Sequence, residues 1–292
     1  MKRILITGAN SYIGTSFEQY LAQWPEDYHV DTISVRGDQW KNYDFSEYDS
    51  VFHVAGIAHA DVGHVSEEQK ELYYKINTEL TVTVAQKAKA DGARQFIFMS
   101  SAIVYGDSAP IGKTKIITKD TPVAPAGFYG DSKVQAENGL RLLEDATFRV
   151  VILRPPMIYG PGSKGNYPVL SKLAQKLPVF PYVKNERSML YVGNLVEFVR
   201  LIVENQESGT FWPQNKEYSN TSELVRMIAE AHGKKIVLVH GFTWALKVLG
   251  HFNGLVNKAF GSLVYENNMN DFDYQYCRYS VEETISETEG AT

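Results

Sequence analysis

Short, almost wholly apolar runs alternate with longer amphipathic stretches along the first half of the chain. The apolar runs are Arg3–Thr7, Val30–Val35, Ser50–Val54, Gln95–Met99 and Arg149–Leu153. Strands that are apolar throughout must be covered on both faces, as they are in a parallel sheet flanked by helices. The alternation therefore predicts an α/β fold of the Rossmann type, with a doubly wound parallel sheet.

The stretches between the apolar runs have helical spacing. They predict helices over Ile13–Trp24, Glu67–Ala90 and Tyr129–Leu143. Only about six residues separate Asp44 from the run that starts at Ser50, which is too few for a helix to cross the sheet. We therefore expect one crossover to be a loop.

The composition changes after Pro156, where Gly, Pro and Lys become frequent. This change predicts a Rossmann domain over 1–155, with a returning segment near 187–205, and a smaller, interleaved substrate-binding lobe over 156–292. The segment Thr243–Phe260 is apolar enough to suggest contact with a membrane or a partner. The packed wall of the second lobe is the favoured interpretation, because interior helices have the same pattern.

The charge and cysteine content exclude several classes of protein. The net charge is −5, so there is no basic field to recruit nucleic acid or an anionic membrane. No apolar stretch approaches the ~20 residues of a membrane span, and the N-terminal apolar run is too short for a signal peptide. A single cysteine suits a reducing compartment, and we expect a cytoplasmic protein without a metal site.

The segment Thr7-Gly8-Ala9-Asn10-Ser11-Tyr12-Ile13-Gly14 follows the first predicted strand. A helix N-terminus offers unpaired N–H groups and partial positive charge, so it can bind a pyrophosphate. Gly8 suits the tight turn and Gly14 the close helix–strand packing, whereas Ser11 stands where the middle glycine is usual. This turn predicts a dinucleotide site; the candidate residues are Gly8, Asn10, Ser11, Tyr12, Ile13 and Gly14.

Arg36 follows the second predicted strand, where a dinucleotide-binding fold reads the adenosine ribose. An acidic residue there binds the 2′-hydroxyl of NAD, whereas an arginine accommodates the 2′-phosphate of NADP. No carboxylate stands at this place in Ser34-Val35-Arg36-Gly37. The sequence leaves NAD and NADP both open and slightly favours NADP.

Tyr129 and Lys133 are four residues apart on a predicted helix, so they share one face. Phenol titrates near 10 and is a poor base at neutral pH, but a nearby ammonium and an oxidised nicotinamide favour the phenolate. Ser100 and Ser101 end the preceding strand, where a hydroxyl can orient a reacting oxygen. We expect Tyr129 to be the acid/base, with Lys133 lowering its pKa.

These motifs together resemble the extended short-chain dehydrogenases/reductases, and specifically the NAD-dependent epimerase/dehydratase family that modifies nucleotide sugars. The resemblance covers nearly the whole chain. Its marks are TGANSYIG, FHVAGIAH at Phe52–His59, INT at Ile76–Thr78, MSSAIVYG, YGDSK, LRPPMIYGPG at Leu153–Gly162 and RSMLYVGNL at Arg187–Leu195.

The resemblance implies roles for further residues. Ser101, Tyr129 and Lys133 would be the catalytic residues. Beyond those already named, it implies cofactor contacts from Asp44, Phe45, Ala55, Gly56, Asn77, Ser100 and Pro155. Arg187 would grip the substrate diphosphate, and Asn166 would contact the substrate where Met157 replaces an asparagine frequent in 4-epimerases. Ala58 likewise stands where many of those enzymes carry a lysine.

Three functions remain open on this resemblance. The first is epimerisation at C4 of a UDP-hexose by transient hydride transfer. The second is NADPH-dependent reduction of a nucleotide-linked 4-keto-6-deoxy sugar, which the Arg36, Ala58 and Met157 positions favour. The third is a non-catalytic NADP-binding regulator, which the presence of both Tyr129 and Lys133 disfavours.

The resemblance also implies a homodimer. In the family, the helices that correspond to Thr78–Ala90 and Tyr129–Leu143 pair across a twofold axis. Both stretches carry apolar positions beyond a single stripe, among them Val82, Val84, Leu140 and Leu142.

Overall fold

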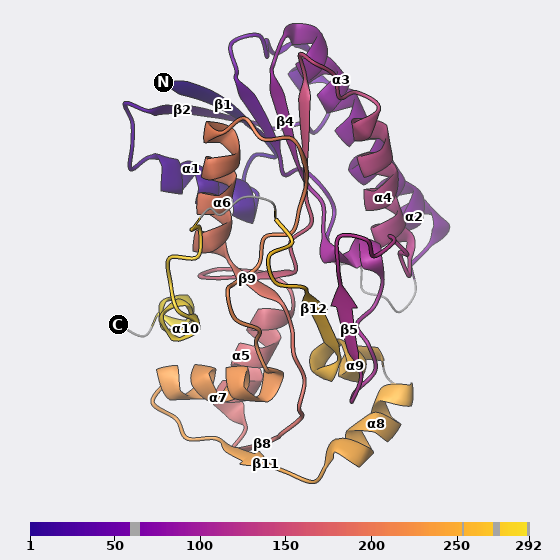
Figure 1. Ribbon diagram of the computed structural model, residues 1–292, viewed down its shortest axis with the longest axis vertical. Helices are drawn as coiled ribbons and strands as arrows, with labels where there is room; N and C mark the ends of the chain where they lie inside the picture. Colours follow the sequence, from indigo (N-terminus) through magenta and orange to yellow (C-terminus); the bar gives the residue numbers. More distant parts are fainter. Residues whose placement is uncertain (59–64, 253, 271–274, 291–292) are drawn as a thin grey trace. The chain divides into compact units, whose positions relative to one another are not determined.

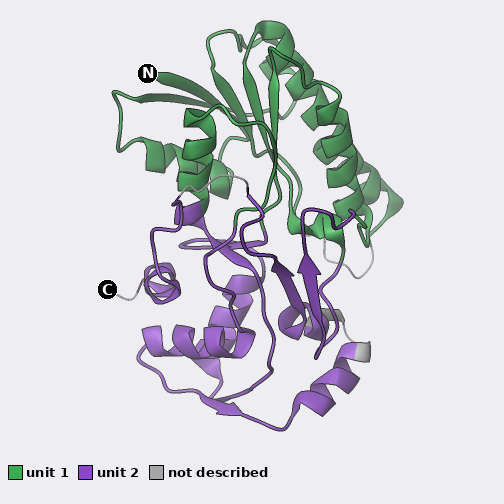
Figure 2. Cartoon of the chain, viewed as in Figure 1, with its two compact units in different colours: residues 1–106, 123–155, 195–213 green, residues 107–122, 156–194, 214–292 purple. Residues whose placement is uncertain are grey.

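The computed structural model describes residues 1–58, 65–252, 254–270 and 275–290. Its chain divides into two compact units (Figure 2). Unit 1 contains residues 1–106, 123–155 and 195–213, and unit 2 contains residues 107–122, 156–194 and 214–292. His59, the last residue of the FHVAGIAH motif, lies outside the described residues.

Unit 1 contains a six-stranded sheet in the order β10-β6-β4-β3-β1-β2. Every neighbouring pair is parallel. The strands are β1 (Lys2–Thr7), β2 (Tyr28–Ile33), β3 (Ser50–His53), β4 (Gln95–Met99), β6 (Arg149–Leu153) and β10 (Gly209–Phe211). The predicted α/β fold with a doubly wound parallel sheet is confirmed.

Helices lie on both sides of this sheet, with α1 and α6 on one side and α3 and α4 on the other (Figure 1). The helical elements are α1 (Tyr12–Leu21), α2 (Glu67–Tyr73), η2 (Tyr74–Leu80), α3 (Thr81–Asp91), η3 (Ala102–Tyr105), α4 (Phe128–Arg141) and α6 (Val192–Glu204). The helix predicted over Glu67–Ala90 is present but is interrupted by the π-helical turns of η2. Between β2 and β3 there is only the 3₁₀ turn η1 (Gln39–Asn42), so the expected loop crossover is confirmed.

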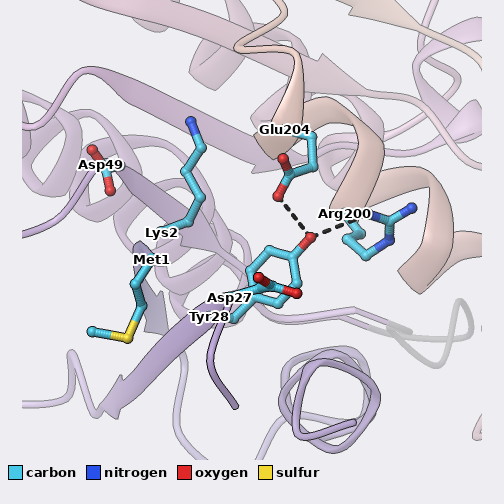
Figure 3. A pocket seen from close by; sticks show the side chains of 7 residues that line it. All are labelled: Met1, Lys2, Asp27, Tyr28, Asp49, Arg200 and Glu204. Carbon is cyan, nitrogen blue, oxygen red and sulfur yellow. Dashed lines mark hydrogen bonds between the residues drawn. The ribbon is translucent and has the colours of Figure 1, made fainter. Parts of the chain in front are cut away.

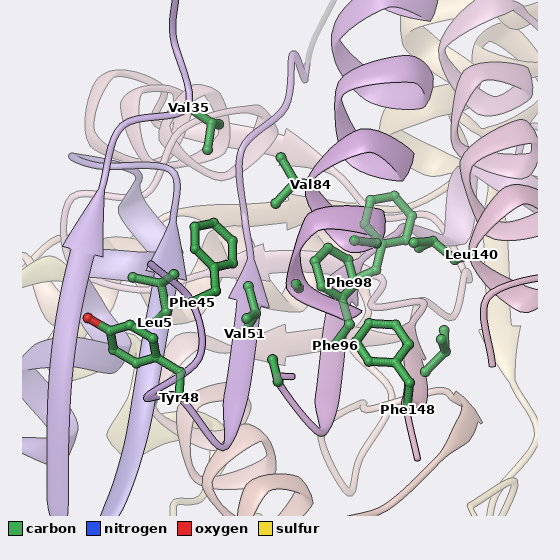
Figure 4. Close-up of a cluster of buried hydrophobic side chains, with 14 of the residues drawn as sticks. Leu5, Val35, Phe45, Tyr48, Val51, Val84, Phe96, Phe98, Leu140 and Phe148 are labelled. Carbon is green, nitrogen blue, oxygen red and sulfur yellow. The ribbon is translucent and has the colours of Figure 1, made fainter. Parts of the chain in front are cut away.

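The core of unit 1 is aromatic and lies between the sheet and the α3–α4 layer. Phe96 and Phe98 of β4 project into it together with Phe148, and Val84 and Leu140 reach them from the helices (Figure 4). Burial of such side chains stabilises the fold by roughly 1.5–3 kcal/mol each. The rigid sheet holds the loops that follow its strands.

Unit 2 is built from three two-stranded parallel sheets and five helices in the described residues. The sheets pair β7 (Met157–Tyr159) with β9 (Met189–Tyr191), β8 (Val179–Pro181) with β11 (Val237–Val239), and β5 (Thr114–Ile117) with β12 (Ser262–Tyr265). The helices are α5 (Asn166–Lys176), α7 (Thr221–Ala231), α8 (Thr243–Phe252), α9 (Gly254–Phe260) and α10 (Val281–Glu289).

The structure corrects the predicted organisation at three places. Residues 107–122 belong to unit 2, because β5 pairs with β12. The returning segment is 195–213 rather than 187–205, since β9 pairs with β7 of unit 2. The segment Thr243–Phe260 is not simply a packed wall, because 71% of Trp244 is exposed.

Candidate functional site

Most of the residues predicted to contact the cofactor follow the carboxyl ends of the strands of unit 1. Each group follows a strand: Gly8 to Gly14 after β1, Arg36 after β2, Ala55 and Gly56 after β3, Ser100 after β4 and Pro155 after β6. Ligands of open α/β sheets bind outside this edge. The topology therefore brings residues far apart in sequence to one edge.

The glycine turn after β1 leaves little room for side chains. Gly8 has φ +129°, and a Cβ there would lie 2.7 Å from the Ala55 amide nitrogen. The Ser11 hydroxyl caps α1 by accepting a hydrogen bond from the Gly14 N–H at 3.1 Å. Because Ser11 accepts this bond, its own hydrogen remains available to a phosphate oxygen. A non-glycine side chain at Gly14 would disturb this cap, since its Cβ would lie 2.6 Å from the Ser11 Oγ.

The first turn of α1 fits a bound dinucleotide. The N–H groups of Tyr12 and Ile13 have no acceptor within the helix, because they belong to its first residues. Asn10 holds the turn in a left-handed conformation, with φ 62°. The Tyr12 hydroxyl is buried and has no hydrogen-bond partner among the described residues, and burial raises its pKa to about 12. A bound polar group would satisfy this hydroxyl.

The residues predicted to contact the adenosine differ in exposure. Arg36 and Asp44 are exposed, whereas Phe45 is fully buried in the core. The Phe45 N–H donates to the Asp91 carboxylate at 3.1 Å, and the Asp44 carboxylate accepts from the Ser46 N–H at 2.8 Å. Arg36 and Asp44 are therefore open to a ligand, whereas Phe45 is part of the core.

Tyr129 and Ser101 meet at the same edge. Ser101 caps η3, and its hydroxyl lies beside the Tyr129 phenol and lowers the pKa of that phenol. Gly130 permits the close packing of α4 on η3, because a Cβ there would lie 2.9 Å from the Ile103 carbonyl oxygen. This packing explains the glycine of the YGDSK motif.

The pKa of Tyr129 is set mainly by burial, which raises it to about 12. The neighbouring Ser101 hydroxyl lowers the pKa, and the nearby Tyr73 raises it. Lys133 does not contribute to the pKa of Tyr129, so the lowering of this pKa that we expected from it is absent. The Lys133 ammonium instead donates a hydrogen bond to the Met99 carbonyl oxygen at 2.9 Å.

Lys133 is buried at the carboxyl end of β4. Its Nζ lies 4.7 Å from the centroid of the Phe98 ring. Burial lowers the Lys133 pKa to about 8, while the carboxylate of Glu137 opposes this shift. A Cβ at Gly56 would approach this Nζ to 3.4 Å, so glycine keeps space open beside the ammonium.

The π-helical segment η2 places Asn77 beneath the site. The Asn77 Oδ1 accepts from the Ile57 N–H at 2.8 Å, and its Nδ2 donates to the Ser132 hydroxyl at 3.2 Å. Ser132 in turn donates to the Tyr129 carbonyl oxygen at 2.8 Å. Asn77 thus connects the loop after β3 to the helix that carries Tyr129, and π segments are frequent at functional sites.

The sequence analysis missed a buried ion pair behind the site. The Glu137 carboxylate accepts from the Ser100 hydroxyl at 2.6 Å and from the Arg154 guanidinium at 2.5 and 3.0 Å. Arg154 also donates to the Tyr105 hydroxyl at 2.6 Å. Two signals could have found it: a carboxylate one turn after Lys133, and an arginine in the otherwise apolar strand end LRPP.

The residues predicted to bind substrate, Asn166 and Arg187, lie in unit 2. Asn166 begins α5 and is exposed. Arg187 donates to the carbonyl oxygens of Lys258 and Ala259 in the last turn of α9, and burial lowers its pKa. A helix C-terminus attracts such a cation, so one nitrogen of this guanidinium is already bound within the protein.

A pocket of about 590 Å³ lies at the opposite, amino-terminal edge of the sheet (Figure 3). It is lined by Met1, Lys2, Asp27, Tyr28, Asp49, Arg200 and Glu204. The Tyr28 hydroxyl donates to Glu204 at 2.6 Å and accepts from Arg200 at 3.1 Å. These groups bind one another, and none of the predicted site residues lies here.

Comparisons with known proteins identify the family. The model of the NAD dependent epimerase/dehydratase family matches residues 4–212. The chain belongs to this family. It is 30% identical over 287 residues to the UDP-glucose 4-epimerase of Vibrio cholerae, covering 90% of this chain and 86% of that relative.

Solved structures of nucleotide-sugar epimerases and reductases share the fold over almost the whole chain. One is a UDP-glucuronic acid 4-epimerase from Bacillus cereus in complex with NAD, with a TM-score of 0.75 and 18% identity over 99% of this chain and 98% of that one. Another is a dTDP-4-dehydrorhamnose reductase from Bacillus anthracis in complex with NADP, with a TM-score of 0.72 and 19% identity, covering 99% and 98%. Both cofactors therefore occur on this fold.

The apolar positions cited for a family-type dimer mostly have partners within the chain. Val84 and Leu140 are fully buried in the core of unit 1. Val82 packs on Gly139, where a Cβ would lie 2.6 Å from a Val82 methyl group. Leu142 is 86% exposed and is the only exposed one of the four, all of which the structure describes.

In the part of the chain that the structure describes, no helix has both the length and the apolar character needed to cross a membrane.

Proposed function

We propose that this family member is a cytoplasmic, NAD(P)-dependent epimerase that acts at C4 of a UDP-hexose, with Tyr129 as acid/base. The observation that carries the proposal is the position of Tyr129 beside Ser101 at the strand edge, with Lys133 one turn later on α4. The name of the Vibrio cholerae relative supports the choice of substrate.

Different residues of the chain would bind the cofactor and the substrate. The N–H groups of the Gly8–Gly14 turn would hold the cofactor phosphates, and Arg36 would face the ribose. Asp44, Ala55, Asn77, Ser100 and Pro155 would complete the cofactor site, with Phe45 and Gly56 shaping it. Asn166 and Arg187 would bind the substrate, Arg187 through guanidinium nitrogens that α9 does not occupy. When bound, the dinucleotide supplies the hydride acceptor and donor.

Tyr129 moves the proton. Its phenol carries its proton at neutral pH, as an ordinary tyrosine does, so it has a proton to give; burial raises its pKa further, to about 12. To act as a base it must become the phenolate, which the Lys133 ammonium would favour if it turned from the Met99 carbonyl oxygen towards the phenol. Ser101 orients the reacting oxygen of the sugar through the same hydroxyl that contacts Tyr129.

The alternative is an NADPH-dependent reductase of a nucleotide-linked 4-keto-6-deoxy sugar. The exposed Arg36 after β2 favours it, because a guanidinium matches a phosphate in bidentate fashion. Under this alternative the cofactor exchanges with solution in each turnover, whereas an epimerase retains it.

The preference for NADP can be measured directly. We expect Arg36→Ala to weaken NADP binding about tenfold and to leave NAD binding unchanged, because a charged hydrogen bond to the 2′-phosphate is lost. Arg94→Ala is the matched control, since Arg94 is also exposed but precedes β4 at the opposite edge. Unchanged NADP affinity in Arg36→Ala, by calorimetry, would show that Arg36 does not read the ribose.

The cofactor that the purified protein carries separates the two activities. We expect denaturation to release a stoichiometric dinucleotide, and UDP-glucose or UDP-N-acetylglucosamine to be epimerised without added NADPH. Chromatography of the supernatant and of the sugar products gives the result. No released dinucleotide, with turnover of a 4-keto sugar only when NADPH is added, would establish the reductase instead.

A further inference from the structure

The segment 231–265 differs in charge from the rest of the chain. It contains four lysines, Lys234, Lys235, Lys247 and Lys258, and no aspartate or glutamate. The whole chain has 34 acidic residues against 29 lysines and arginines. An acidic protein therefore has a local basic segment, which contains β11, α8, α9 and β12.

Helix α8 and the residue before its first turn expose large apolar side chains in this segment. Trp244 is 71% exposed, Val248 and Leu249 are each 54% exposed, and Phe242 is 53% exposed. Trp244 and Val248 are one turn apart on one face, with the exposed Lys247 beside them. We call these five residues the α8 face.

Neighbouring elements of unit 2 extend the same character. A Cβ at Gly112 would lie 2.9 Å from the Lys247 ammonium, so the turn that carries the exposed Lys113 lies beside α8. Just before α8 in the chain, Val237 of β11 is 61% exposed, and its register partner Val179 of β8 is 51% exposed (Figure 1). Unit 2 therefore exposes further apolar side chains on β8 and β11, and a further lysine in the turn beside α8.

We propose that the α8 face binds the surface of a membrane that contains anionic lipids. Tryptophan and aliphatic side chains suit the boundary between headgroups and acyl chains, and lysines suit the anionic headgroups. A twofold contact between two copies of this chain would join two surfaces that both carry Lys247 and to which the segment 231–265 contributes no carboxylate. With 10 residues, α8 lies on the membrane surface and is too short to cross.

This attachment is separate from the proposed catalytic function and does not depend on it. Its test uses the full chain, sedimented with vesicles of phosphatidylcholine alone or of phosphatidylcholine with phosphatidylglycerol. We expect binding to the phosphatidylglycerol vesicles that weakens as salt is added. Trp244→Ser should reduce this binding about tenfold or more, and Lys247→Ala about fivefold.

Intrinsic fluorescence gives a second, residue-specific signal. Of the four tryptophans, all of which the structure describes, Trp40 and Trp212 are buried, Trp24 is half-buried and Trp244 is exposed. Vesicles with brominated acyl chains should therefore quench the wild-type emission and leave that of Trp244→Phe almost unchanged. Trp244→Phe should still sediment with the vesicles, because phenylalanine keeps an apolar ring.

Matched controls lie on α5 of the same unit. Val169 is 56% exposed and Lys172 is exposed, so Val169→Ser and Lys172→Ala should bind vesicles as the wild type does. Unchanged thermal unfolding shows that each variant is folded. The proposal is overturned if the wild type does not sediment at low salt, or if Trp244→Ser binds equally well. Absence of vesicle binding together with a dimer that Trp244→Ser dissociates would assign the face to a second copy.

Discussion

Replacing Tyr129 by phenylalanine is expected to lower kcat about a thousandfold while leaving the bound dinucleotide in place. The phenol is the acid/base in the proposed mechanism, and a positioned proton donor contributes roughly 10²–10⁴-fold to rate. The ring itself remains, so its packing on Tyr73, with centroids 6.0 Å apart, is kept. Turnover of UDP-sugars and the released dinucleotide should be measured on the same preparation.

Tyr73→Phe is the matched control for this experiment. It removes the phenol next to Tyr129 without removing the proposed acid/base, and we expect little change in kcat. Near-normal turnover of Tyr129→Phe would refute the assignment. Wild-type protein that binds the dinucleotide but turns over no sugar nucleotide or ketone would instead favour the non-catalytic regulator.

Replacing Arg154 by methionine is expected to destabilise unit 1 by about 3–5 kcal/mol, because it leaves the Glu137 carboxylate buried without its closest cation. Glu137 is fully buried and Arg154 is 7% exposed. Arg141 also contacts Glu137, at 3.2 Å, but its own side chain is 40% exposed. The unfolding free energy in urea, followed by circular dichroism, measures the effect.

A surface ion pair provides the comparison. Arg226 contacts Glu223 and Glu230 at 2.7 Å on the exposed side of α7, and its side chain is 41% exposed. Arg226→Met should change stability by no more than about 1 kcal/mol. Equal effects of the two substitutions would mean that the Glu137–Arg154 pair does not stabilise the fold.

Much of the fold follows from local sequence patterns. The strands of the parallel sheet could be predicted because their residues are apolar on both faces, as in Gln95–Met99, which is β4 without change of boundary. The π-helical interruption at η2 could not be predicted, since Asn77 in this segment hydrogen-bonds the backbone of Ile57, 20 residues earlier in the chain. Strand β5 also escaped prediction, because its partner β12 lies far along the chain.

The candidate site was predictable where spacing alone fixes geometry. Tyr129 and Lys133 share a helix face, and Ser101 follows a strand that ends beside them. The direction in which the Tyr129 pKa shifts was not predictable, because the shift depends on burial and on which group the Lys133 ammonium contacts. The Glu137–Arg154 pair joins α4 to the end of β6; the sequence marks each residue as unusual where it stands, but not that the two meet.

Strand β2 is one of the two edge strands of the six-stranded sheet in the described chain. On its outer side, its backbone N–H and C=O groups have no neighbouring strand. Such borders template the addition of foreign strands and so invite aggregation. Here the strand is six residues long and carries His29 and Asp31, which bind each other at 2.9 Å, while Tyr48 donates to Asp31. Polar and charged groups on a short edge strand oppose the addition of a foreign strand.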